Sequence, residues 1–389
     1  MTSQSLHGLA FSWARQFGMY DLREFSIRDV PELSATRAEK MEKWKTWASL
    51  EIQRRTVLGL YIIDGQLARY SSGAPVGRHV TNPMIYSSRE SIFSAKNADD
   101  WIFQMNQHWV KPSTFREVFV SVFDLKAQRL SSLTPHFSIY VALEGLQALL
   151  SESCDADCTA LGIPSRTQII NALLRFRNDY LEMSPTSLES LELLLRWHAL
   201  CLDLAMDAVL LCLKLCAHHG VEQNLFLNGR ASSLTIELDD WDDWTCSVNA
   251  RRALLHAISI QDIAERLPIG RAHATHIPAS VFAAATVYCA FSTVGQVHVL
   301  APESIDWEEI WHHCDNTMQG NANTNDAASP PSDSKLFVAG FPLSDVKAKA
   351  RNVRYSLFTL QAIIRSISSQ WGVSQEMLNI LLSWTSHAS

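Results

Sequence analysis

"RWHALCLDLAMDAVLLCLK", residues 196–214, is a run of mostly apolar side chains in which charged residues recur. It contains neither proline nor glycine, and the same pattern continues on both sides from residue 186 to residue 218. Apolar residues at helical spacing over such a length are typical of a helix that packs into a core. The stretch therefore predicts one long buried helix, and it indicates the fold class of the chain around it.

Similar patterns recur along most of the chain, separated by short segments that combine proline or glycine with Ser, Thr or Asn. They predict helices at 35–70, 97–109, 113–129, 136–152, 166–183, 186–218, 247–265, 277–292, 304–313 and 343–386. No segment shows an alternation that would predict a strand. The sequence therefore predicts an all-α protein, a large helical bundle that forms a single domain over residues 1–389. The low-complexity stretch 319–335 is expected to be a flexible surface loop before a last helical hairpin.

The composition narrows the classes of function. Because 47% of the 389 residues are hydrophobic, the chain can bury a large core. Its formal net charge is -7 and it has no long block of Lys and Arg, so we expect no direct DNA binding by this chain alone. Neither a signal peptide nor a membrane-spanning stretch is apparent. These features predict an intracellular protein, in the nucleus or the cytoplasm, without a membrane partner.

The eight cysteines do not form a zinc or disulfide pattern. No Cys-x-x-Cys pair occurs, and three of the cysteines lie in or beside the apolar run, so we expect buried reduced thiols. Three short clusters have the composition of metal-ligand sets: "CDADC" at 154–158, "HATH" at 273–276 and "WHHCD" at 311–315. None has the paired spacing of a structural zinc site, so they are expected to hold no metal.

Four motifs follow one another along the chain. The first is W-x-x-W-x-x-x-E-x-x-R-R, formed by Trp44, Trp47, Glu51, Arg54 and Arg55. The others are A-x-x-A-x-x-W at 95–101, W-H-x-L-C at 197–201 and A-R-R-A-x-x-H-A at 250–257. Their combination resembles the fungal-specific transcription factor domain, in the version carried by factors with zinc fingers of the two-cysteine, two-histidine kind.

The resemblance implies an all-helical regulatory or effector domain of a transcription regulator, for example one that controls a secondary-metabolite gene cluster. Such a domain is expected to act through a protein partner or a small effector. The zinc finger itself is absent and the chain starts inside the domain, so relative to the family it is N-terminally truncated. The family's acidic, cysteine-containing segment appears here as "TNPMIYSSRESIF" at 81–93, which leaves the role of this segment open.

The residues of the first motif have an interpretation as structural residues. On a helix, Trp44 and Trp47 lie three residues apart and share a face. Glu51 lies three residues before Arg54 and four before Arg55, and this spacing favours ion pairs. We therefore expect an aromatic anchor with an adjoining network of charges.

The remaining motif residues are also expected to be structural. Asp64 is predicted to extend the Glu51 network, and the arginines and histidine of the fourth motif are predicted to close their helix against a neighbour. These further candidates are Asp64, Trp197, His198, Arg251, Arg252 and His256.

Charged residues of the opening stretch coincide on a helical projection. At about 100° per residue, Arg196, Asp203, Asp207 and Lys214 fall within about 40° of one another on a continuous helix. One interpretation is a thin polar strip on an otherwise buried helix, with Glu192 paired to Arg196. Asp203 and Asp207 carry like charges at a spacing where they repel each other. This feature suits another interpretation, in which the strip lines a cavity.

In the cavity interpretation the helix carries an enzyme site. Asp203 and Asp207 would hold magnesium through carboxylate oxygens, while Lys214 and Arg196 neutralise a diphosphate. Such a set would suit an atypical magnesium-dependent terpene (sesquiterpene) cyclase acting on a prenyl diphosphate. The acidic run "ELDDWDDW" at 237–244 is expected to be a loop instead. The regulator interpretation assigns no catalytic, cofactor or metal residue, and it is preferred because its motif set is the more specific pattern.

Overall fold

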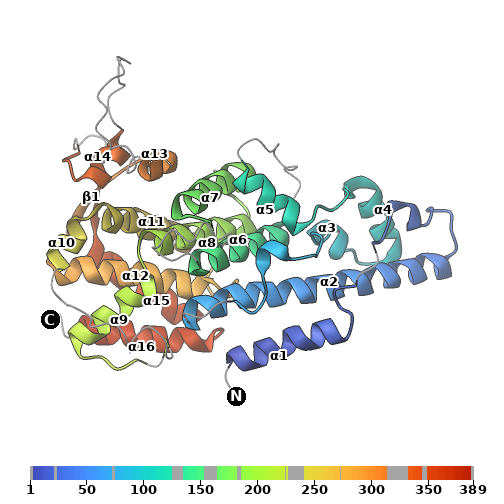
Figure 1. Cartoon of the computed structure of the whole chain (residues 1–389), viewed down its shortest axis with the longest axis horizontal. Coiled ribbons are helices and arrows are strands. Elements are labelled where there is room, and N and C mark those ends of the chain that lie inside the picture. The colour runs from blue at the N-terminus through green and yellow to red at the C-terminus, as the bar shows by residue number, and fades with distance from the viewer. Residues whose placement is uncertain are drawn as a thin grey trace, which may run out of the picture. The chain divides into compact units, whose positions relative to one another are not determined.

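Helices form nearly all of the regular structure in the computed structural model of the protein (Figure 1). The structure describes residues 3–21, 24–71, 75–124, 135–152, 164–181, 185–223, 225–226, 241–271, 273–312, 332–343 and 348–386. Over these residues the sheet structure is limited to two strands, so the predicted all-α class is confirmed. The chain divides into two compact units, Met1–Ser184 and Pro185–Ser389. The single domain expected over the whole chain stays a prediction.

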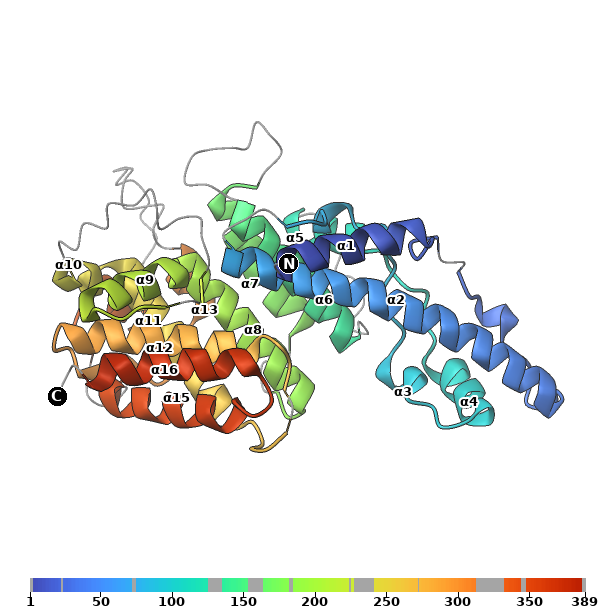
Figure 2. The same cartoon turned by 90° about the horizontal axis from the view of Figure 1, so that it is seen from below.

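Unit 1 is built on one long helix, α2 (Arg37–Ser71), which stands out in Figure 2. Thr36 Oγ1 accepts the Glu39 N–H at 3.3 Å and so satisfies a donor of its first turn. The helices that pack on α2 are α1 (Ser3–Gln16), α4 (Ala98–His108) and α6 (His136–Glu152). The other elements of the unit are the 3-10 turns η1 (Ile27–Asp29) and η2 (His79–Thr81) and the helices α3 (Glu90–Phe93), α5 (Phe115–Phe123) and α7 (Arg166–Tyr180).

Two buried glycines of unit 1 allow close contacts of helix α6 with its neighbours. A Cβ atom on Gly65 would lie 2.7 Å from Glu144 Oε2 and 2.9 Å from Glu144 O, and one on Gly145 would overlap the ring of Phe119. A Cβ atom on Gly59, earlier in the same helix, would meet no heavy atom within 4 Å. Because a packed interior has no spare room, the contact of α2 with α6 requires glycine at Gly65 and the contact of α6 with Phe119 of α5 requires glycine at Gly145, whereas Gly59 has no such neighbour.

Unit 2 is built around α12 (Ile277–Thr293), whose residues 277–291 are all buried. A helix that is apolar on every side is a core helix, and its neighbours surround it. The helices that pack on α12 are α8 (Leu188–Ala205), α9 (Ala208–His219), α10 (Trp241–Cys246), α11 (Val248–Ala264), α15 (Val353–Ile367) and α16 (Gly372–Ser386). The other elements are α13 (Trp307–His312), α14 (Asp333–Ala339) and the antiparallel strands β1 (His298–Pro302) and β2 (Ala348–Asn352).

The predicted helix 186–218 is wrong in one respect, because the segment forms two helices. Helix α8 ends at Ala205, and Met206 is extended with φ −153° and ψ 148°. Asp207 then caps α9, since its Oδ1 accepts the Leu210 N–H at 3.0 Å. A side chain that bonds the main chain in this way competes with helix continuation, which explains the break.

Other predicted boundaries also need correction. The helical pattern predicted over 343–386 is wrong over residues 348–352, which form β2, whereas the predicted last helical hairpin is confirmed by α15 and α16, which pack together. Strand β2 exists through its pairing with the distant β1, which no local pattern reveals. Helices α1, α3, α10 and α14 were not predicted. The predicted loop 319–335 lies outside the described residues as far as residue 331, and residues 333–335 belong to α14. None of the described helices is both long and apolar enough to cross a membrane.

Candidate functional site

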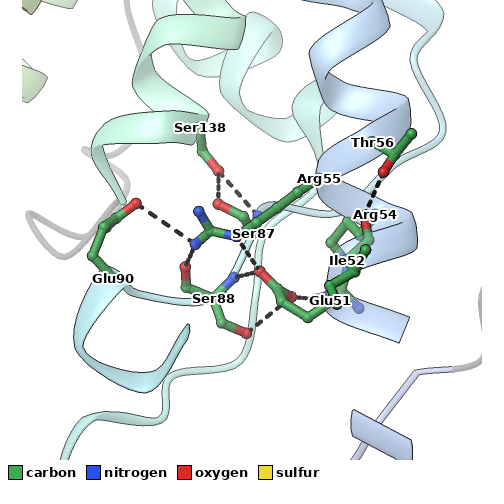
Figure 3. Close-up of polar contacts among 9 residues, drawn as sticks. All are labelled: Glu51, Ile52, Arg54, Arg55, Thr56, Ser87, Ser88, Glu90 and Ser138. Carbon is green, nitrogen blue, oxygen red and sulfur yellow. Dashed lines mark hydrogen bonds and ion pairs between the residues drawn. The ribbon is translucent and has the colours of Figure 1, made fainter. Parts of the chain in front are cut away.

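Glu51 of α2 is the centre of a buried polar network in unit 1 (Figure 3). Its Oε1 accepts Arg55 Nε at 2.9 Å and the Ser88 N–H at 2.8 Å. Its Oε2 accepts Arg54 Nη1 at 2.7 Å and Ser88 Oγ at 3.2 Å. Because burial of a carboxylate is costly unless it is paired and hydrogen-bonded, four donors are what this site needs. The predicted ion pairs of Glu51 with Arg54 and Arg55 are confirmed.

The network ties the segment before α3 to α2. Arg55 Nη2 donates to Ser88 O at 2.7 Å and lies 3.6 Å from Glu90 Oε1, and its guanidinium lies over the Phe93 ring, 4.0 Å from the centroid. Ser88, Glu90 and Phe93 all belong to the stretch 81–93. This stretch therefore supplies a hydrogen-bond acceptor, a nearby carboxylate and a ring contact for Arg55 of the first motif.

The tryptophans of the first motif lie on one face, as predicted. Trp47 is buried, and its ring centroid lies 5.7 Å from that of Trp101. Phe25 contacts Trp101 edge-on at 5.9 Å, and Trp44 is partly buried against the same cluster. Because Trp101 closes the second motif, the first two motifs meet in one aromatic core.

A small pocket lies where the aromatic core meets the Glu51 network. Its water-accessible volume is about 80 Å³. Its lining combines aromatic and cationic side chains, among them Phe25, Trp47, Trp109, Arg54, Arg89 and Lys111. We call it the Arg54 pocket, because Arg54 connects its wall to Glu51. No sequence pattern indicates a pocket here, since its lining comes from five separate segments.

Asp64 does not extend the Glu51 network, so that prediction is wrong. Its carboxylate lies 3.2 Å from His7 Nε2 and 3.5 Å from His79 Nε2, and it accepts the N–H groups of Val76 at 2.9 Å and Gly77 at 2.8 Å. Burial alone would raise the pKa of Asp64, but the hydrogen bonds from both histidines and both backbone N–H groups outweigh it and lower the pKa. The sequence could not have identified these partners, because no periodicity connects residues 7, 64 and 79.

In unit 2 the W-H-x-L-C and A-R-R-A-x-x-H-A motifs also meet. His198 Nδ1 of α8 lies 3.0 Å from His256 Nδ1 of α11, so one ring donates and the other accepts. His256 stacks on Trp307 of α13 with 4.3 Å between ring centroids, and Trp197 contacts Trp307 edge-on at 5.9 Å. This buried aromatic cluster joins α8, α11 and α13.

The arginines of the fourth motif reach other helices. Arg252 Nε donates to Ile310 O of α13 at 2.7 Å, and its guanidinium lies 4.8 Å from the centroid of the Trp311 ring. Arg251 Nη1 donates to Phe337 O of α14 at 3.4 Å. The prediction that Arg251, Arg252 and His256 close α11 against its neighbours is confirmed.

The charged residues of the predicted strip do not share a continuous helical face, because the helix breaks at Met206. Asp203 belongs to α8, whereas Asp207 precedes α9 and its carboxylate is used as the helix cap. Arg196 is 1% exposed, so a solvated strip is wrong for this residue too. Lys214 is a half-buried residue of α9. The magnesium and diphosphate roles of these residues stay predictions. The structure lacks the common helical face on which those predictions were based.

The histidines of "HATH" bind other parts of the protein. His273 Nδ1 lies 3.0 Å from Glu192 Oε1 and its Nε2 lies 2.9 Å from Pro268 O, while His276 Nε2 lies 3.0 Å from Glu192 O. Within the described residues, no group of three or more His, Cys, Asp or Glu side chains is placed to hold a metal ion. "CDADC" and residues 313–315 of "WHHCD" lie outside that part of the chain. The acidic run at 237–244 was expected to be a loop, but its residues 241–244 are in α10.

Buried cysteines of unit 2 are free thiols, as predicted for Cys201, Cys212 and Cys216. A hydrogen bond with Cys212 lowers the pKa of Cys216, whereas burial raises the pKa of Cys289 to about 12. At neutral pH burial therefore keeps Cys289 a protonated, unreactive thiol.

No model of a protein family, no curated protein and no solved structure matches this chain. The resemblance to the fungal-specific transcription factor domain therefore rests on the four sequence motifs and stays a prediction. The geometry adds that the motifs pack in pairs, the first with the second and the third with the fourth.

Proposed function

We propose that this chain is a regulatory domain of the fungal transcription factor kind, which acts through a protein partner or a small effector and does not itself bind DNA. The observation that carries the proposal is the pairwise packing of the four motifs: Trp47 meets Trp101, and His198 meets His256. Residues that define the resemblance are thus explained as the framework of a helical domain, and the pocket beside Glu51 remains as a place for an effector.

The charge supports the absence of direct DNA recognition. A net charge of -7 disfavours the phosphate backbone, whose neutralisation provides most of the affinity of DNA-binding proteins. In a gel-shift assay at physiological salt, the purified protein should therefore give no competitor-resistant band with duplex DNA. Such a band would contradict this part of the proposal.

The cyclase alternative receives no support from the geometry. It required two carboxylates and two cations on one face of one helix, and the break at Met206 removes that face. Incubation with farnesyl diphosphate and magnesium should accordingly give no cyclised hydrocarbon in headspace analysis. A product that disappears in both Asp203→Ala and Lys214→Ala would replace the regulator by an enzyme.

A tethering assay tests the regulatory role directly. The full chain is fused to a heterologous DNA-binding domain in a fungal host, and transcription of a reporter with the matching sites is compared with that from the DNA-binding domain alone. We expect a several-fold change in reporter level. The same fusion carrying Trp47→Ala is the matched variant, because loss of the aromatic anchor should remove the effect. An expressed, nuclear wild-type fusion that leaves the reporter unchanged would contradict the proposal.

A further inference from the structure

We propose that the Arg54 pocket binds a small carboxylate that carries a flat apolar group, with benzoate as its simplest representative. The inference deepens the proposed function by naming a class of effector, and it rests on that function for its biological meaning. Its own basis is the chemistry of the pocket wall.

The cationic wall of the pocket is a buried arginine with unused donors. Arg54 is 5% exposed, and its Nη1 donates to Glu51 Oε2 at 2.7 Å. Its Nε has no hydrogen-bond partner within the described residues. A guanidinium carries five N–H donors, and a buried donor left unsatisfied costs free energy. Arg54 is therefore prepared to bind a further acceptor.

Glu51 cannot be that acceptor, because its carboxylate is already occupied. Arg55 Nε, the Ser88 N–H, Arg54 Nη1 and Ser88 Oγ bind its two oxygens. Arg54 thus shares one saturated carboxylate with Arg55. A second carboxylate, brought by a ligand, would give Arg54 a charge-assisted hydrogen bond of its own.

The remainder of the wall selects a flat apolar group. Phe25, Trp47 and Trp109 line the pocket beside Arg54. Aromatic rings favour offset-stacked or edge-on contacts with another ring. A ring attached directly to the carboxylate would therefore contact indole surface while its charged end lies at Arg54.

Size and charge limit the ligand further. The water-accessible volume of about 80 Å³ is smaller than the roughly 150 Å³ apolar cavity that holds benzene in an engineered protein, so part of the ligand extends into the mouth. The lining includes Arg89 and Lys111, whose side chains form no ion pair within the described part of the chain, and one carboxylate, Glu24. The mouth therefore attracts anions, and its size suits a single ring rather than a nucleotide.

Fluorine NMR of the purified full-length protein tests the proposal with para-fluorobenzoate as the probe. We expect saturable broadening of the probe signal with a Kd of about 1 mM or tighter, and no saturable effect with the neutral para-fluorobenzamide. Arg54→Met should weaken binding about tenfold or more, because it removes the charged group that binds the carboxylate. Lys43→Ala, an exposed cation on the same helix outside the pocket, should leave binding unchanged.

Because Arg54→Met also removes a partner of Glu51 and can unfold unit 1, a second set of variants keeps the test decisive. Arg89→Ala and Lys111→Ala change the charge of the mouth, and Trp109→Ala removes part of the ring contact. Each should weaken binding several-fold while circular dichroism stays that of the wild type. Absence of saturable binding, equal binding of the amide, or unchanged affinity in all three folded variants would overturn the proposal. The reporter assay does not use the probe, so failure here leaves the regulatory role standing.

Discussion

Two Arg-Arg pairs, one in each unit, are used in different ways. Arg54 and Arg55 of α2 bind the carboxylate of Glu51 in their own helix. Arg251 and Arg252 of α11 donate to main-chain carbonyls of α14 and α13, and Arg252 Nη1 also donates to Asn249 Oδ1 of its own helix at 3.2 Å. The first pair forms a buried charge network and the second joins helix to helix.

The difference comes from the residues one turn earlier. Glu51 precedes Arg54 by three residues and Arg55 by four, the spacing at which helical side chains meet. At the equivalent places before Arg251 and Arg252 the chain has Ser247, Val248 and Asn249, none of which is charged. Arg251 and Arg252 instead donate to carbonyls near the C-terminal ends of other helices, where a cation is favoured. The preceding turn thus distinguishes the two pairs, because it offers Arg54 and Arg55 a carboxylate and offers Arg252 the amide oxygen of Asn249.

The sharpest test of this contrast removes the carboxylate. Glu51→Ala should lower the free energy of unfolding by about 3–5 kcal/mol, because it leaves the buried Arg54 without its ion-pair partner. Urea denaturation followed by tryptophan fluorescence measures the loss. Glu42→Ala, an exposed carboxylate on the same helix, should change stability by no more than about 0.5 kcal/mol. Equal effects of the two variants would show that the network is not stabilising.

The corresponding change in unit 2 should cost less. Arg252→Met keeps much of the side-chain volume but removes the donor to Ile310 O, and hydrogen bonds of charged groups contribute about 1.5–3 kcal/mol. The same denaturation experiment applies, with the exposed Arg271→Met as the matched control. If Arg252→Met proved as costly as Glu51→Ala, the distinction between a charge network and a carbonyl contact would fail.

The buried carboxylate of Asp64 can be tested by lowering the pH, because protonation removes its charge. The pKa of Asp64 is lowered in the folded protein, so its contribution to stability is present above the ordinary value of 3.8 and is lost as pH falls below it. Asp64→Asn should cost about 1–3 kcal/mol near neutral pH, and the gap to the wild type should narrow at pH values under 3.8. Unfolding free energies measured across this range check it. The exposed Asp21→Asn should give a gap that stays near zero, and a constant gap for Asp64→Asn would contradict the assignment.

The smallest effect concerns a carboxylate that serves the main chain. Asp207→Ala removes the cap of α9 and should cost about 1 kcal/mol. Asp207→Asn, which keeps a capping oxygen, should cost clearly less. The thermal unfolding midpoint of the two variants gives the comparison. Should Asp207→Asn be as destabilising as Asp207→Ala, the carboxylate would have to act through its charge, as Glu51 does.

The fold class and the motif contacts could be predicted because they depend on local spacing. Glu51 meets Arg54 and Arg55 within one turn of one helix, and Trp44 and Trp47 share a face for the same reason. The apolar run around Arg196 likewise predicted helical structure, and α8 and α9 form there. Such relations need only the geometry of a helix.

The remaining features depend on contacts between distant segments. The break at Met206 follows from a cap that Asp207 offers, and the sequence alone gave no way to weigh this cap against the helical pattern. Strand β2 needs β1, and Asp64 needs His7 and His79 from outside α2. The Arg54 pocket is a property of several segments together. Side-chain patterns carry no information on such pairings until the chain is folded.

The close contact of Gly65 with Glu144 has a consequence for synthesis on the ribosome. Helix α2 is translated long before α6, so its surface around Gly65 has no native neighbour while the chain between them is being made. Domains fold as units during synthesis, and apolar surface exposed in the meantime favours aggregation. A nascent chain that stops before residue 136 therefore leaves exposed the part of α2 that α6 covers in the folded unit, and synthesis of α6 supplies that cover.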